Sequence, residues 1–143
     1  MASPPMRTYH ASLEIQTAGP RTYDVTDLIT REITTCGIRS GIATVFCQHT
    51  SCSLVIMENA SPDARRDLEK FLDRLVPPDP NFRHTEEGPD DMPSHVKTAL
   101  TTTSETIPIK DGRLLLGTWQ GVYLWEHRVA PHSRHLALVI IGE

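Results

Sequence analysis

The sequence lacks a long hydrophobic run. Nowhere do roughly eighteen apolar residues follow one another, the length that a membrane-spanning helix needs. The opening stretch, MASPPMRTYHASLEIQ, also lacks the apolar central block of a secretory signal. We therefore expect a chain that starts at Met1, has no membrane partner and is cytoplasmic.

An excess of basic charge is missing too. The 14 Lys and Arg residues are outnumbered by 18 Asp and Glu residues, which gives a net charge of −4 and a pI near 5.9. The basic residues are scattered apart from a modest C-terminal group, so no broad positive field attracts a phosphate backbone. Nucleic acid is therefore not an expected partner.

Cysteine is scarce and odd in number, with Cys36, Cys47 and Cys52. The last two lie in the segment CQHTSC, whose spacing is neither that of a redox CxxC motif nor that of a zinc-ribbon knuckle. We expect buried, reduced thiols.

The length of 143 residues suits a single domain over residues 1–143, with a flexible N-terminus at residues 1–6. Apolar residues on alternate positions of TYHASLEIQ predict a first strand. Thr26 as cap, apolar residues at helical spacing and Gly37 as stop then predict a short helix.

The middle of the chain turns rich in β-branched residues. Residues 38–59 predict either a buried strand pair or one bent strand, with the bend near QHTS. A helix follows, with Ser61 as N-cap and Pro62 at its first position. Its predicted apolar stripe consists of Leu68, Phe71, Leu72 and Leu75.

The second half is dominated by hairpins. A third helix is expected around PSHVKTALT, capped by Asp90 or Asp91, and Asp111-Gly112 marks the turn of a hairpin. The segments TWQGVYLWEH and HLALVIIGE predict two more strands. The pattern favours an α+β class with a mainly antiparallel sheet or sandwich and about three helices.

The segment HTEEGPDDMPSH, residues 84–95, carries two histidines and four carboxylates. His84 and His95 bracket it, and together with His49 they offer a possible three-imidazole metal site. Zinc is preferred over magnesium by such ligands. The alternatives are a core role for His49, which shares the alternation of the preceding strand, and solvation for His84.

Asp90 and Asp91 precede the third helix directly. One of them can cap the helix, but its neighbour must then point elsewhere. The second carboxylate could hold a hydrated magnesium ion against a diphosphate or act as a general base.

The segment GTWQGVYLWEHR adds further candidates. Trp119 and Trp125 could be packing residues, or Trp119 could form an aromatic wall, since the flanking glycines allow close backbone approach. Arg128, with Arg134 nearby, could bind the phosphate of a phosphorylated small-molecule substrate. The alternative is a solvated strand end.

Several of these segments in this order resemble the YjbQ family, a group of small secondary thiamine-phosphate synthase enzymes. The resemblance rests on HTSCSLVIMEN, HTEEGPDDMPSHVK and IPIKDGRLLLGTWQGVYLWEHR, and it runs from about residue 7 to the C-terminus. It implies an α+β YjbQ-like fold and a homotrimer with pockets near the subunit contacts. It departs at His127, where some family members carry an aromatic residue, and at the segment with His132, whose roles stay open.

The resemblance also implies a site composition. The implied site residues are His49, His84 and His95, with Glu58, Asn59, Asp90, Asp91, Gln120 and Glu126.

Three functions follow as hypotheses. The first is a metal-dependent enzyme with thiamine-phosphate synthase activity, joining hydroxymethylpyrimidine diphosphate to a thiazole phosphate, with Asp90, Asp91, Arg128 and Trp119 assisting. The second is a metal-assisted hydrolase with Glu126 or Glu58 as base. The third is a non-catalytic trimer that binds a metal or a ligand.

Overall fold

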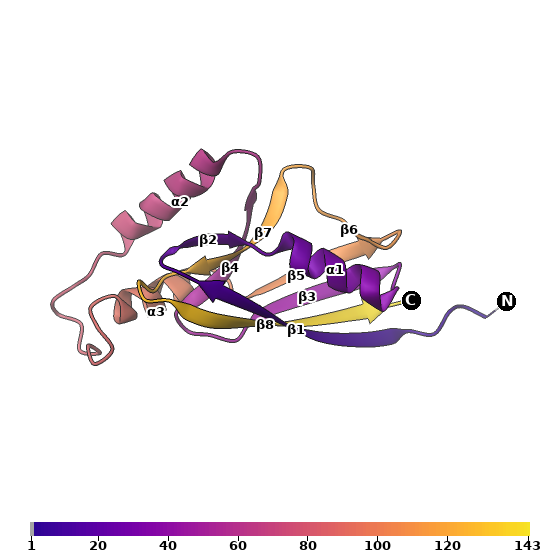
Figure 1. The fold of residues 1–143 in the computed structure, drawn as a ribbon, viewed down its shortest axis with the longest axis horizontal. Helices are drawn as coiled ribbons and strands as arrows, with labels where there is room; N and C mark the ends of the chain where they lie inside the picture. The colour runs from indigo at the N-terminus through magenta and orange to yellow at the C-terminus, as the bar shows by residue number, and fades with distance from the viewer. Residues whose placement is uncertain (1) are drawn as a thin grey trace.

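The computed structural model of the protein describes residues 2–143, which form two antiparallel sheets (Figure 1). The larger sheet has the strand order β1-β8-β3-β5-β6, and the smaller one has the order β2-β7-β4. The strands are β1 Arg7–Thr17, β2 Arg21–Asp24, β3 Gly41–Cys47, β4 Cys52–Glu58, β5 Ser104–Lys110, β6 Arg113–Leu114, β7 Gln120–Glu126 and β8 His132–Gly142. The predicted α+β class is confirmed.

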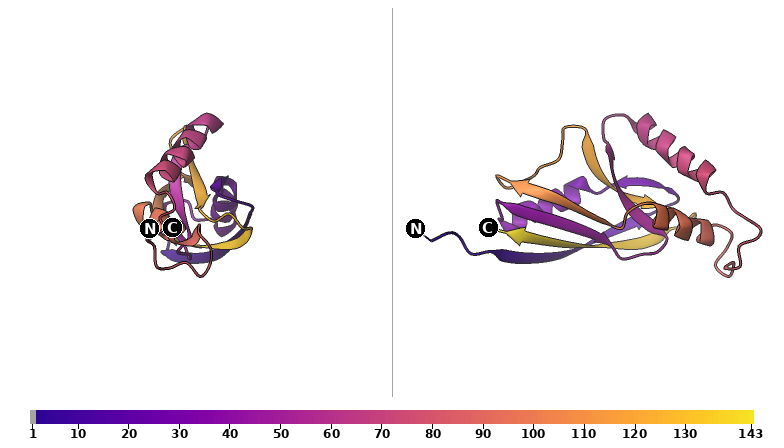
Figure 2. Two further views of the ribbon diagram at one scale, coloured as in Figure 1. Left: turned by 90° about the vertical axis from the view of Figure 1, so that its left-hand side faces the viewer. Right: turned by 180° about the vertical axis from the view of Figure 1, so that it is seen from behind.

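Three helices complete the described chain: α1 Thr26–Cys36, α2 Pro62–Leu75 and α3 Asp91–Leu100. Figures 1 and 2 show α1 lying along the sheets, whereas α2 and α3 lie at the end of the molecule away from the two termini. Among residues 2–143, no helix is long and apolar enough to cross a membrane.

The core lies where the larger sheet meets the smaller sheet and α1. Leu13 and Ile15 of β1 are buried as the alternation predicts, and Ile29 and Ile33 of α1 pack into the same cluster. Burying a side chain of this size stabilises the fold by roughly 1.5–3 kcal/mol. The first strand and the first helix are therefore held by one apolar core.

The segment QHTS connects the two sheets. β3 pairs with β5 and β8, whereas β4 pairs with β7 in the other sheet. The predicted bend is confirmed, but the two strands do not pair with each other, so a bent path is the correct alternative. This bend places Gln48–Ser51 at the junction of the sheets.

Two predicted helix details need correction. Thr26 is the first residue of α1 and not its cap; its Oγ1 accepts a hydrogen bond from the Val122 amide of β7 at 2.9 Å. In α2, Ser61 and Pro62 hold the predicted positions. Phe71 and Leu75, however, are more than half exposed, because α2 projects from the sheets.

The predicted hairpin at Asp111-Gly112 is confirmed. Both residues have positive φ, 53° and 74°, as the tight hairpin turn requires. At the N-terminus, residues 2–6 form neither helix nor strand. The predicted flexible N-terminus also includes Met1, which lies outside the described residues.

Candidate metal centre and its pocket

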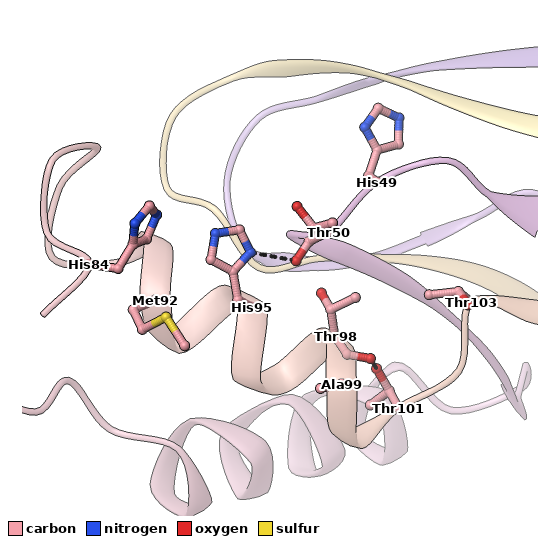
Figure 3. A pocket seen from close by; sticks show the side chains of 9 residues that line it. All are labelled: His49, Thr50, His84, Met92, His95, Thr98, Ala99, Thr101 and Thr103. Atoms are coloured by element: carbon pink, nitrogen blue, oxygen red, sulfur yellow. Dashed lines mark hydrogen bonds between the residues drawn. The ribbon is translucent and has the colours of Figure 1, made fainter. Parts of the chain in front are cut away.

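A pocket of about 720 Å³ lies between the bend after β3 and the exposed side of α3 (Figure 3). Its lining residues are His49, Thr50, His84, Met92, His95, Thr98, Ala99, Thr101 and Thr103. Its volume falls within the range of small-molecule sites, roughly 300–1,000 Å³. All three histidines that the sequence singled out as metal ligands therefore lie on one pocket.

Two of these histidines converge on a carboxylate. His84 Nε2 lies 2.8 Å from Asp91 Oδ2, and His95 Nε2 lies 3.0 Å from the same oxygen. Asp91 and His95 are four residues apart on α3, so they occupy one helix face, and His84 reaches them from the preceding loop. One ligand atom from each residue lies within 4.8 Å of the others, a group that could hold a metal ion.

The backbone fixes the orientation of His95. Its Nδ1 lies 2.7 Å from the Thr50 carbonyl oxygen, and because a carbonyl only accepts, Nδ1 carries the hydrogen. In neutral His95 the Nε2 lone pair then faces the Asp91 carboxylate. Two acceptors at 3.0 Å need a proton or a cation between them. In metal sites, a histidine that binds the ion through one ring nitrogen typically donates the N–H of the other ring nitrogen to a carboxylate or a backbone carbonyl.

Asp91 is ionised although it is almost fully buried, with 2% of its surface exposed. Burial alone raises the pKa of a carboxyl group, but the hydrogen bonds from His84 and His95 and the charges of His95 and Arg128 outweigh burial. The pKa of Asp91 therefore lies below its usual range, and the group is available as an anionic ligand.

Asp90 occupies the predicted N-cap position of α3, but its side chain makes no capping hydrogen bond. Asp91 is the first residue of the helix and not its cap. The Asp90 carboxylate instead accepts hydrogen bonds from Arg128 Nε at 3.0 Å and from the Val129 amide at 2.9 Å. Burial opposes these contacts, but they prevail and lower the pKa of Asp90.

The guanidinium group of Arg128 is engaged in hydrogen bonds with the acidic loop. Besides Asp90, its guanidinium donates to Asp91 Oδ1 at 2.8 Å and to the Glu87 carbonyl at 2.8 Å. The predicted anion pocket around Arg128 is therefore not formed. Since Arg128 fastens three residues between 87 and 91, the acidic segment is a fixed wall of the site.

Glu126 is a structural anchor and not a free base. It is fully buried, and its two oxygens accept from Thr17, from the backbone amides of His127 and Arg128, and twice from Arg134. Burial raises its pKa, but these donors lower it further than burial raises it. The proposal that Glu126 serves as base is wrong in this geometry, because every side of the carboxylate is occupied.

His49 lines the pocket but is not in the ligand group. Its Nε2 accepts the backbone N–H of His135 at 2.8 Å, so this lone pair is not available to a metal. Burial, followed by the charges of Arg134 and His135, lowers the pKa of His49. The predicted set of three imidazoles is therefore replaced by two imidazoles and the Asp91 carboxylate.

The remaining predicted site residues form a separate group. Glu58 pairs with Gln120 in the β4–β7 register, six residues along β4 from Cys52. Asn59 contacts the turn before β7, where the backbone N–H of Asn59 donates to the Trp119 carbonyl at 3.0 Å. A seven-residue strand spans about 20 Å, so this group lies at the end of the β4–β7 pair away from the pocket. The fold thus divides the predicted site in two.

The sequence did not indicate that threonines line the pocket, and it left the roles of His127 and His132 open. Thr98 follows Asp91 and His95 at helical spacing, which could have revealed it. His127 is buried against Ser53 Oγ at 2.9 Å, and burial lowers its pKa to about 3. His132 contacts the Ala130 carbonyl through Nδ1. Neither His127 nor His132 lines the pocket.

The family follows from comparison with other sequences. A family model described as UPF0047 protein YjbQ-like matches residues 11–143. The chain belongs to the YjbQ-like UPF0047 family. The UPF0047 protein sll1880 of Synechocystis is 49% identical over 138 residues, which cover 96% of this chain and 94% of that relative. The UPF0047 protein YjbQ of Escherichia coli O157:H7 is 43% identical over 106 residues, 74% of this chain and 77% of that relative.

Solved structures of the family share the fold. An uncharacterized conserved protein of the YjbQ/UPF0047 family from Clostridium acetobutylicum superposes with a TM-score of 0.84 at 34% identity, covering 91% of this chain and 98% of its own. A YbjQ-like protein of unknown function from Sulfolobus solfataricus gives a TM-score of 0.89 at 24% identity, covering 97% and 100%, and at that identity it supports the fold alone.

Proposed function

We propose that the protein is a metal-dependent hydrolase of small molecules, with a zinc ion held by His84 Nε2, Asp91 Oδ2 and His95 Nε2. The observation that carries the proposal is the convergence of these three atoms within 4.8 Å beside the pocket. Zinc takes imidazole and carboxylate ligands, and its catalytic sites keep a fourth position open. When bound, the metal supplies a Lewis acid that activates water.

The separations of the donor atoms are close to those of a zinc site. Two ligand atoms of a tetrahedral site with bonds of about 2.0 Å are separated by about 3.3 Å. The two contacts to Asp91 Oδ2, 2.8 and 3.0 Å, are slightly shorter. Magnesium fits less well, because it prefers six oxygen ligands. The contacts of His95 with Thr50 and of Asp91 with Arg128 orient the ligands, as supporting contacts do in metal sites.

The thiamine-phosphate synthase activity implied by the resemblance is a second candidate. The pocket volume favours it, since about 720 Å³ is enough for two small substrates. The charge of the pocket does not favour it, because a leaving diphosphate needs cationic donors and no Lys or Arg occurs among the described lining residues. We therefore place hydrolysis first.

Metal content tests the centre itself. We expect one zinc per chain by elemental analysis of protein purified without chelator, and loss of that zinc in Asp91→Asn and His95→Ala. His10→Ala is the matched control, because His10 is an exposed histidine of β1 outside the pocket. Full zinc occupancy in Asp91→Asn would remove Asp91 from the ligand set.

Turnover tests the activity. Zinc-loaded protein is assayed with esters, amides and phosphomonoesters, and separately with hydroxymethylpyrimidine diphosphate plus thiazole phosphate. Hydrolysis that stops on chelation and returns with zinc supports the first candidate, and thiamine phosphate supports the second. Stoichiometric zinc without turnover of any substrate would identify a metal-binding protein instead.

The homotrimer is part of the same proposal. Light scattering after size exclusion should give about three times the 16.0 kDa of one chain. A mass of one chain would contradict the trimer while leaving the metal centre, whose ligands all come from one chain, intact.

A further inference from the structure

The ring of His49 is held in one tautomer. Its Nε2 lies 2.8 Å from the backbone nitrogen of His135, and a backbone N–H can only donate. Nε2 is therefore the acceptor, and in the neutral ring the hydrogen sits on Nδ1. Burial lowers the pKa of His49, which keeps the ring neutral near pH 7.

The free N–H of His49 faces the pocket. Figure 3 shows one ring nitrogen of His49 turned toward the side of His95 and the other turned away from it. Within residues 2–143, no protein acceptor pairs with Nδ1, whereas Nε2 has the His135 amide. His49 thus offers a hydrogen-bond donor across the pocket from the metal ligands.

The rest of the wall offers little charge. Thr98 and Thr101 direct their hydroxyls at protein partners, the Cys52 carbonyl at 3.5 Å and Ser53 Oγ at 2.7 Å. Met92 adds an apolar side chain, and no Lys or Arg lines the pocket among the described residues. Apart from the proposed zinc, a bound phosphate would find no Lys or Arg side chain on this wall to replace its hydration. An uncharged ligand does not meet this penalty.

We propose that His49 binds the substrate, and that the substrate is an uncharged carbonyl compound, an ester, lactone or amide, whose carbonyl oxygen accepts the Nδ1–H bond. The proposal rests on the hydrolase function given above. In the reaction, the oxygen of water adds to the carbonyl carbon, the bond from that carbon to the alcohol oxygen or amine nitrogen breaks, and the leaving group takes up a proton from water. The products are a carboxylic acid and an alcohol or amine.

The donor of His49 acts where charge develops. Negative charge grows on the carbonyl oxygen as water adds, so a fixed neutral donor at that oxygen binds the transition state more strongly than the ground state. Loss of one such donor lowers kcat by roughly 100- to 1,000-fold. Because His49 does not hold the metal, its removal should leave zinc content unchanged.

The tautomer is measured first, because it needs neither metal nor substrate. Long-range ¹H–¹⁵N spectra of the protein with labelled histidine should show His49 protonated at Nδ1 and bare at Nε2, with His49→Ala used for assignment. His135→Ala is the control and should keep this pattern, since the hydrogen bond to His49 Nε2 comes from the backbone N–H of His135, although its ring also stacks on that of His49. A hydrogen on Nε2 or on both nitrogens overturns the proposal.

The substrate class is measured with p-nitrophenyl acetate and p-nitrophenyl phosphate. Zinc-loaded protein should hydrolyse the acetate, and His49→Ala should lower kcat about 100-fold or more with zinc content unchanged and with a rise in KM much smaller than the fall in kcat. His49→Gln, which restores an N–H donor, should recover part of the rate. Preference for the phosphate, no acetate turnover, or an unchanged rate in His49→Ala overturns this proposal. Absence of zinc from the wild-type protein overturns the hydrolase function itself.

Discussion

Arg128 Nη1 lies 2.8 Å from Asp91 Oδ1, on the side of the carboxylate opposite the two histidines. This contact joins the chain segment after β7 to Asp91, the proposed metal ligand at the start of α3. Because the Arg128 side chain is only 11% exposed, water screens the ion pair weakly. The position of the proposed ligand therefore depends on a residue that does not line the pocket.

Arg128→Lys should weaken zinc binding by about 10- to 100-fold, the range found when contacts that orient metal ligands are removed. A lysine has one ammonium group and cannot reproduce the paired bonds to Asp90 and Asp91. Calorimetric zinc titration measures the change. Arg66→Lys is the control, because Arg66 forms an exposed pair with Asp63. An unchanged zinc affinity in Arg128→Lys would show that Asp91 is oriented by other contacts.

His127 should make the metal-free protein less stable in mild acid. Burial is the main cause that lowers its pKa in the folded state to about 3, against about 6.5 in the unfolded chain. The unfolded state therefore binds more protons between these values, so stability is full above pH 6.5 and falls as pH falls toward 3. Between pH 6.5 and 5 the expected loss is about 2 kcal/mol, measured by urea unfolding.

The matched variant separates His127 from other titrating groups. His127→Phe keeps a ring of similar shape but cannot take up a proton, so its stability should fall less between pH 7 and 5. The buried carboxylates act in the same direction but at lower pH, because the folded pKa values of Asp91 and Glu126 lie below their unfolded values. Equal pH dependence in wild type and His127→Phe would assign the acid sensitivity elsewhere.

Local patterns in the sequence predicted much of the fold because they report short-range physics. The alternation in β1 and the turn at Asp111-Gly112 depend on neighbouring residues only, and both are found in the structure. The exposure of Phe71 was not predictable in this way, because its helical stripe is apolar and only the position of α2 leaves it uncovered.

Only part of the candidate site could be predicted from the sequence, because several of its contacts join residues that are far apart along the chain. The four-residue spacing of Asp91 and His95 indicates one helix face, but it does not show that His84 reaches the same carboxylate from the preceding loop. His49 pairs with a backbone amide 86 residues away, and no local pattern reports such a contact. Glu126 stands in a polar run typical of a site, but the fold buries it against Arg134.

The three cysteines should be inert in the native protein. Cys36, Cys47 and Cys52 are free and buried, with 7%, 1% and 0% of their surfaces exposed. Ellman's reagent should therefore label none of them under native conditions and all three in urea, because reaction requires an accessible thiolate. Labelling of one thiol in the native protein would indicate local opening, and mass spectrometry after proteolysis would locate it.

Trp119→Phe should leave both zinc binding and stability unchanged. Trp119 is 63% exposed and lies in the turn that contacts Asn59, away from the pocket, so the change in unfolding free energy should stay within about 0.5 kcal/mol. Trp125, by contrast, is 5% exposed in a small cluster with Leu72. In the wild-type protein, acrylamide should therefore quench the fluorescence of Trp119 strongly. In Trp119→Phe, where only Trp125 remains, acrylamide should quench little of the fluorescence.

The same variant tests the aromatic wall that the sequence suggested. If Trp119 contacts substrate, its replacement raises KM in the ester assay and leaves zinc content unchanged. The geometry predicts no such effect within one chain, because Trp119 does not line the pocket. Protection of Trp119 from acrylamide would show instead that another chain covers this turn in the assembled protein, and dilution below the assembly threshold should then restore quenching.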